Sequence, residues 1–155
     1  MVKGLRELKT KLTKTIPSRV REATQKAMEQ GAAEIVAMMK RLVPIESGEL
    51  RDSIGWTWGQ APRCSQKIAT VKGQEGDLAI TIYAGNEKVR YAHLVEFGTR
   101  AHLNKGKFDG TQHPGSAAQP FFYVSFRTLR KKTRGRITRA MRKAIRTEAA
   151  DTGDE

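Results

Sequence analysis

The stretch YAHLVEFGT, residues 91–99, separates the apolar middle of the chain from a long polar segment. Across residues 91–97, apolar side chains occupy both odd and even positions, so an extended segment would carry apolar groups on both faces. Gly98 can supply the unusual backbone angles of a turn that leaves such a segment. The pattern predicts a mostly buried strand, and the purpose of that strand has to be inferred from the rest of the chain.

Before this stretch, the spacing of apolar residues predicts two helices. The first, over residues 5–16, carries leucines at steps of three and four on a basic background. Pro17 interrupts it, and because proline is tolerated only in the first turn of a helix, a second helix should begin near Pro17 and run to about Leu42. The apolar stripe of this second helix comprises Met28, Ala32, Ile35, Met39 and Leu42.

The middle of the chain is rich in β-branched residues. KIATVKG (67–73) and DLAITIYAG (77–85), which are joined by a GQEG turn, predict a hairpin. With residues 56–58 as a preceding strand and residues 91–97 as the last, we expect a meander of about four strands.

Residues 99–119 contain three glycines, one proline and little apolar content, which predicts a long loop. Pro120 then begins a final helix, in which Phe122, Phe126 and Leu129 are placed to pack on the sheet and Gly135 is a weak point. The predicted fold class is α+β, with a long N-terminal helix, a small antiparallel sheet of about four strands and a basic C-terminal helix.

The chain has 155 residues, the size of one ordinary domain. We expect a basic helical segment at residues 1–17, a single domain over residues 18–147, and an acidic disordered tail at residues 148–155.

A net charge of +13 points to a polyanionic partner or a charged assembly. Between Arg127 and Arg146 there are ten basic side chains and no acidic one. Such side chains neutralise phosphates without reading base sequence. The candidate contacts to DNA or a partner are Lys105, Lys107, Arg130, Lys131, Lys132, Arg134, Arg136 and Arg139.

Residues with catalytic or metal-binding chemistry are few and scattered. His93, His102 and His113 are the only imidazoles, and their spacing matches no metal motif. No phosphate-binding loop, nucleophile elbow or convincing acid and base pair is present, so we expect no enzymatic activity, no metal and no cofactor. A single cysteine, Cys64, fits a reducing cytoplasm. No run approaches the roughly 20 apolar residues that span a bilayer, so we expect no membrane partner and production in the cytoplasm.

Three blocks of sequence, taken in order, resemble the neck and tail-completion proteins of long-tailed phages, the group that includes minor tail protein Z. The blocks are LVPIESGELRDSI (42–54), YAHLVEFGT (91–99) and AAQPFFYVSFRT (117–128). The resemblance spans about residues 20–145. It implies an α+β domain with a non-enzymatic role at the head–tail junction of a virion, assembled in the cytoplasm of a bacterial host, and it fits tail completion and tail termination alike.

The same resemblance implies a homo-oligomer, such as a hexameric ring around the DNA channel. Its partners would be other neck, portal-side and tail proteins, together with packaged double-stranded DNA contacted nonspecifically. A ring needs two different complementary patches on each subunit. Glu96 is a candidate for such an inter-subunit contact, because a buried acid needs a partner, and Arg51 is one possible mate. The alternative function is a small basic nucleic-acid-binding accessory protein that acts through nonspecific phosphate contacts.

Overall fold

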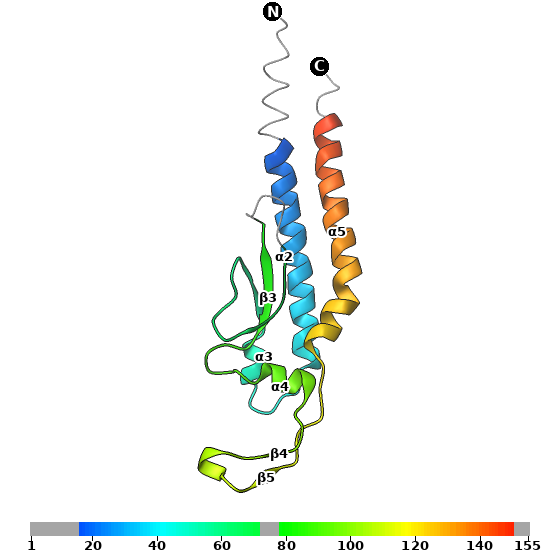
Figure 1. Ribbon diagram of the computed structural model, residues 1–155. Helices are drawn as coiled ribbons and strands as arrows, with labels where there is room; N and C mark the ends of the chain where they lie inside the picture. Colours follow the sequence, from blue (N-terminus) through cyan, green and yellow to red (C-terminus); the bar gives the residue numbers. More distant parts are fainter. Residues whose placement is uncertain (1–15, 72–77, 151–155) are drawn as a thin grey trace, which may run out of the picture. The chain divides into compact units, whose positions relative to one another are not determined.

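The computed structural model describes residues 16–71 and 78–150 (Figure 1). They form two compact units. The first, the mixed unit, is Ala32–Thr128, and the second, the helical unit, contains the described residues before Ala32 and after Thr128. The helix predicted over residues 5–16 lies almost entirely outside the described residues, and the domain boundaries given above stay a prediction.

The long N-terminal helix is α2 (Ile16–Leu42), which ends at the residue where the sequence predicted its end. The predicted start near Pro17 lies at the edge of the described residues and stays a prediction. The predicted stripe is buried at Met28, Ala32, Ile35 and Met39. Leu42 is exposed instead, because the helix ends there, and Val43 is the next residue that turns into the core.

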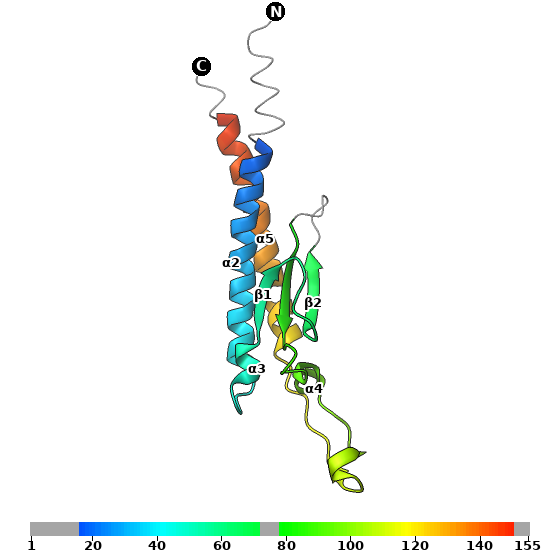
Figure 2. The same cartoon turned by 90° about the vertical axis from the view of Figure 1, so that its left-hand side faces the viewer.

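The C-terminal helix, α5 (Phe122–Ala150), continues through Gly135 without a break and extends into the segment predicted to be a disordered tail. In the helical unit, residues 16–31 of α2 lie beside residues 129–150 of α5 (Figures 1 and 2). A Cβ atom on Gly31 would overlap the Cγ2 atom of Thr133, so the two helices approach closely because glycine has no side chain.

The sheet of the mixed unit has three antiparallel strands, β1 (Gly55–Trp58), β2 (Gln66–Val71) and β3 (Ile80–Ala84). The positions of these strands were predicted, but the meander was wrong. The order is β1-β3-β2, so β3 is the central strand and pairs with both neighbours (Figure 2). The turn predicted at residues 73–76 lies outside the described residues.

Residues 91–97 do not form a strand, which corrects the sequence prediction. They form α4 (Ala92–Phe97). A short apolar run fits a helix as well as a strand, and the deciding feature is that Ala92 and Glu96, one helical turn apart, are the buried pair.

A short helix, α3 (Glu49–Asp52), follows α2. Ser53 at its end is buried, and its Oγ donates a hydrogen bond to the Leu50 carbonyl oxygen at 2.7 Å. The same Oγ accepts a hydrogen bond from the Gly85 N–H at 3.1 Å. The first sequence block therefore ties α3 to the end of β3.

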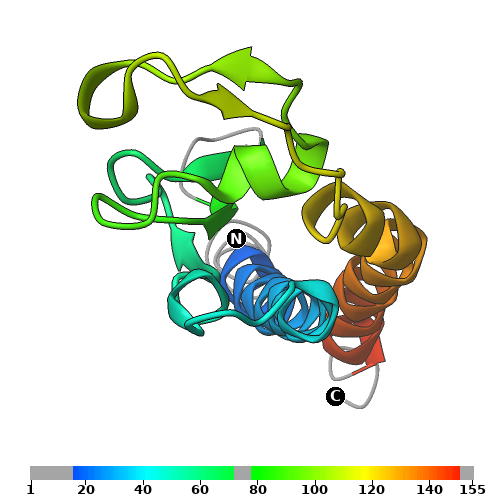
Figure 3. The same ribbon diagram turned by 90° about the horizontal axis from the view of Figure 1, so that it is seen from below.

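The segment predicted as a loop contains a small hairpin. β4 (His102–Leu103) and β5 (Gln112–His113) pair antiparallel, and a 3-10 turn, η2 (Gly106–Phe108), joins them. We call residues 99–116 the arm. Figure 3 shows the arm running past α4, apart from the three-stranded sheet.

Candidate functional site

The carboxylate of Glu96 caps the start of α5. Its side chain is only 3% exposed. Oε2 accepts hydrogen bonds from the Phe121 and Phe122 N–H groups at 2.8 Å each, and Oε1 accepts one from the Tyr123 N–H at 3.0 Å. The first N–H groups of a helix have no partner within the helix, and its positive end favours a carboxylate, so Glu96 meets both requirements.

The chain between α4 and α5 is held at the same place. The Gln119 N–H donates to the Val95 carbonyl oxygen at 2.9 Å. Pro120, the next residue, has no N–H that needs a partner. The ring of Phe97 packs against that of Tyr123, with centroids 5.9 Å apart. α4 therefore fixes both the position and the direction in which α5 begins.

The arm leaves this region through a narrow crossing of its two ends. Thr99 and Ser116 each donate a backbone N–H to the other's carbonyl oxygen at 3.0 Å, and their hydroxyl oxygens also lie 3.0 Å apart. Gly98 has φ 70° and ψ 178°, a region that only glycine adopts readily. A Cβ atom there would lie 2.6 Å from the Ser116 carbonyl oxygen. Gly115 has φ 86°, and a Cβ atom on it would lie 2.5 Å from the Thr99 carbonyl oxygen.

We call Glu96, Gly98, Thr99, Gly115 and Ser116 the clamp. Beyond the clamp, the arm is stabilised by its own hydrogen bonds. The Asn104 N–H donates to the Thr111 carbonyl oxygen at 2.8 Å, and the Asn104 side-chain amide donates to the Thr111 hydroxyl at 2.8 Å.

The arm exposes apolar and basic side chains together. Leu103 and Phe108 are 68% and 66% exposed. Lys105 precedes the turn at the tip and Lys107 lies within it, and both are exposed. Both side chains are therefore available to contact another molecule.

A groove lies at the base of the arm. Its volume is about 200 Å³, below the roughly 300–1,000 Å³ of typical small-molecule pockets, so it suits a side chain better than a cofactor. Tyr91 and Leu94 line it and are 37% and 42% exposed. The other lining residues are Pro44, Glu46, Ser47, Gly48, Leu50, Val95, Ser116, Ala117 and Gln119.

The two residues of the predicted inter-subunit pair lie in different environments. Arg51 is exposed on α3, whereas Glu96 is buried and engaged by backbone N–H groups of its own chain. Among the described residues no ion pair joins the two. A contact of either residue with a neighbouring subunit stays a prediction.

The predicted basic contacts occur in two places. Lys105 and Lys107 are on the arm. The others lie along α5, where Arg136 is partly buried and the remaining five are exposed: Arg130, Lys131, Lys132, Arg134 and Arg139. Their roles in binding DNA or a partner stay predictions.

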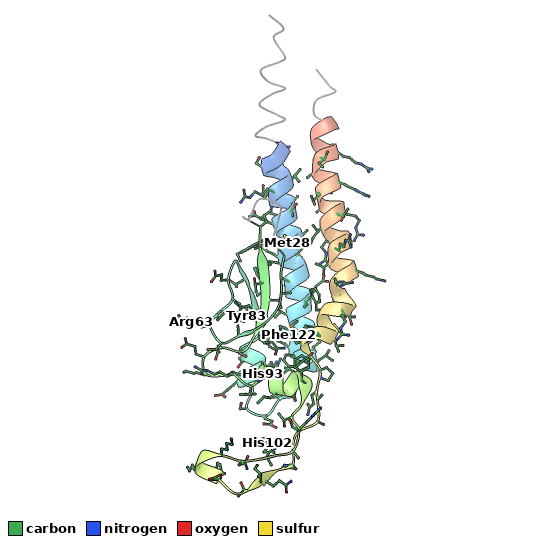
Figure 4. The ribbon with its side chains drawn as sticks, in the orientation of Figure 1. Met28, Arg63, Tyr83, His93, His102 and Phe122 are labelled. Carbon is green, nitrogen blue, oxygen red and sulfur yellow. The ribbon has the colours of Figure 1, made fainter. Side chains whose placement is uncertain are left out.

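The described residues contain no cluster of three or more side chains able to hold a metal ion. His93 lies on α4, apart from His102 on the arm (Figure 4). His102 and His113 pair across β4 and β5, and their rings stack with centroids 5.0 Å apart. No helix in the described part of the chain is long and apolar enough to cross a membrane.

Two features of the site were not predicted from the sequence, although the sequence carries a signal for each. The first is the capping role of Glu96. Its signal is that α5 begins after Gln119-Pro120, where no serine, threonine, aspartate or asparagine can act as a local cap. The second is the apolar tip, and its signal is a large aromatic residue, Phe108, in an otherwise polar segment.

Comparison with known proteins identifies the family. The family model described as "Bacteriophage HK97-gp10, putative tail-component" matches residues 6–98. The match extends through α4 to Gly98 and stops where the arm begins. Searches of curated proteins and of solved structures found no match. The chain therefore belongs to the HK97-gp10-like family of bacteriophage tail components, as the sequence blocks predicted.

Proposed function

We propose that this tail component acts at the head–tail junction, where copies of the chain form a ring that joins heads to tails. The observation that carries the proposal is the arm, which a buried carboxylate and two glycines hold at its base while its tip exposes apolar and basic groups. A rigidly held base and an unpartnered tip suit a part that docks during assembly.

Ring closure requires two different complementary surfaces on one subunit. The mixed unit has two candidates, the exposed arm tip and the groove lined by Tyr91 and Leu94. The basic face of α5 would contact packaged DNA or acidic neighbouring proteins, because clustered lysine and arginine bind phosphates without sequence preference.

Assembly of particles that lack this protein tests the proposed function. We expect filled heads and finished tails to accumulate unjoined in electron micrographs, and the purified protein added back should join them. Heads and tails that join normally without the protein would refute the proposal.

A second measurement separates this function from that of an independent nucleic-acid-binding protein. The family match gives that alternative no support. If it were correct, the isolated monomer would bind duplex DNA with an affinity that falls steeply with salt. We expect weak DNA binding by the monomer and ring formation in the presence of tail or portal-side proteins.

A further inference from the structure

We propose that the tip of the arm docks into the groove of a second copy of this chain, with Phe108 as the apolar anchor and Lys107 facing Glu46. This inference rests on the proposed ring and names the two surfaces that would form its subunit contact.

The two surfaces match in polarity. Phe108 is 66% exposed at the tip, and the groove offers Leu50, Tyr91 and Leu94 as apolar contacts. Aromatic side chains that enter a neighbouring pocket commonly contribute most of the binding energy of an interface. A groove of about 200 Å³ is of a size to accept such a side chain.

The two surfaces also match in charge. The arm carries Arg100, Lys105 and Lys107 against a single acid, Asp109. Among the described residues that line the groove, Glu46 is the only charged one. Glu46 and Lys107 are exposed, and neither forms an ion pair within the described part of its own chain. Complementary charges of this kind set the partner and the orientation of an interface.

The occupant has to come from another chain, because the root of the arm is itself part of the groove. Ser116 lines the groove and is also locked to Thr99 in the clamp. Folding the tip back onto its own root would require these backbone hydrogen bonds to break. Tip-to-groove contact between copies is head-to-tail, which is the kind of contact that can close into a ring.

Cysteine crosslinking tests the contact without removing the anchor. In a Cys64→Ser background, one protein carries Asp109→Cys beside the anchor and another carries Ser47→Cys in the groove. We expect a disulfide-linked dimer when the two are mixed, and much less from either alone. A chain with both substitutions should give a ladder that ends at the ring size. Lys88→Cys, which is exposed in a different loop, replaces Asp109→Cys as the control.

A charge exchange provides an independent measurement. Lys107→Glu and Glu46→Lys should each weaken self-association by about tenfold or more, and the double exchange should restore most of it. Lys88→Glu is the matched control and should have little effect. Circular dichroism and thermal melting should be unchanged in all four proteins, since these side chains are exposed.

Several results would overturn the inference. They are crosslinks between two Asp109→Cys copies, crosslinks of Asp109→Cys to a different virion protein in assembled particles, and charge exchanges that are not rescued by combination. A ring that forms without the Asp109–Ser47 crosslink would refute the contact and leave the proposed function intact. A chain that neither self-associates nor crosslinks in particles would also refute it, whereas the proposed function fails only if heads and tails join without the protein.

Discussion

The base and the tip of the arm belong to the same stretch of sequence but differ in how their side chains are used. At the base, Glu96 is buried and each of its oxygens is hydrogen-bonded to backbone of the same chain. At the tip, Phe108 and Lys107 are exposed. The base stabilises the fold, and the tip is left available for another molecule.

The difference in burial predicts different effects of substitution. At the base, side chains and backbone hold the fold together, so substitutions there should change stability. At the tip, side chains contact little of their own chain, so substitutions there should change assembly.

Removing the carboxylate at the base should have the largest effect on stability. Glu96→Ala leaves three buried or partly buried N–H groups at the start of α5 without their acceptor, and we expect the free energy of unfolding to fall by about 3 kcal/mol or more. Glu96→Gln keeps one acceptor oxygen and should cost about half as much. Urea denaturation of the full chain measures both. Equal losses for the two variants would argue against capping as the role of Glu96.

Alanine substitutions at two glycines separate the cost of steric crowding from the cost of backbone strain. Gly98→Ala places a Cβ atom against the Ser116 carbonyl oxygen in a conformation that disfavours side chains, so we expect a loss of about 2–3 kcal/mol. Gly106 at the tip also has positive φ, 76°, but a Cβ atom there would have no neighbour within 4 Å. Gly106→Ala should cost about 1 kcal/mol, from the backbone conformation alone. Similar melting temperatures for the two variants would contradict the distinction.

Features that depend on neighbouring residues could be predicted from the sequence, and features that depend on distant contacts could not. The end of α2 and the positions of β1, β2 and β3 follow from local patterns, because periodic burial and β-branched residues act over a few neighbours. The strand order does not, since it depends on which edge of β3 each partner reaches.

The strand prediction for residues 91–97 was wrong because a run of six or seven mostly apolar residues fits the period of a helix as well as that of a strand. In the helical form, Ala92 and Glu96 are buried together and Glu96 reaches the first N–H groups of α5, a contact between residues distant in sequence. The sequence did single out Glu96 as an acid that needs a partner. It could not show that the partner is backbone N–H, because only the fold brings residues 96 and 121 together.

At the tip, removal of the apolar anchor should leave stability nearly unchanged. Phe108→Ser should alter the free energy of unfolding by no more than about 0.5 kcal/mol, because the side chain is 66% exposed. The matched substitution is Phe122→Ser, which should be strongly destabilising because the side chain of Phe122 is fully buried. Sedimentation velocity should show that Phe108→Ser loses self-association while its melting curve overlays that of the native chain. A large drop in melting temperature would place Phe108 in the fold rather than in assembly.

The smallest effect is expected at Glu22, an exposed carboxylate that serves as a counterpart to the buried Glu96. Lys26 Nζ donates a hydrogen bond to Glu22 Oε1 at 2.8 Å, and this bond and the lysine charge lower the pKa of Glu22. Because the folded pKa is depressed, the stabilisation is present above the pKa of the unfolded chain and is lost as pH falls through the folded value. Lys26→Met should return the pKa of Glu22 to its ordinary range in an NMR titration and leave the melting temperature at neutral pH almost unchanged, since solvent screens an exposed pair. If that variant destabilised the chain as much as Glu96→Ala, burial would not decide which carboxylates support the fold.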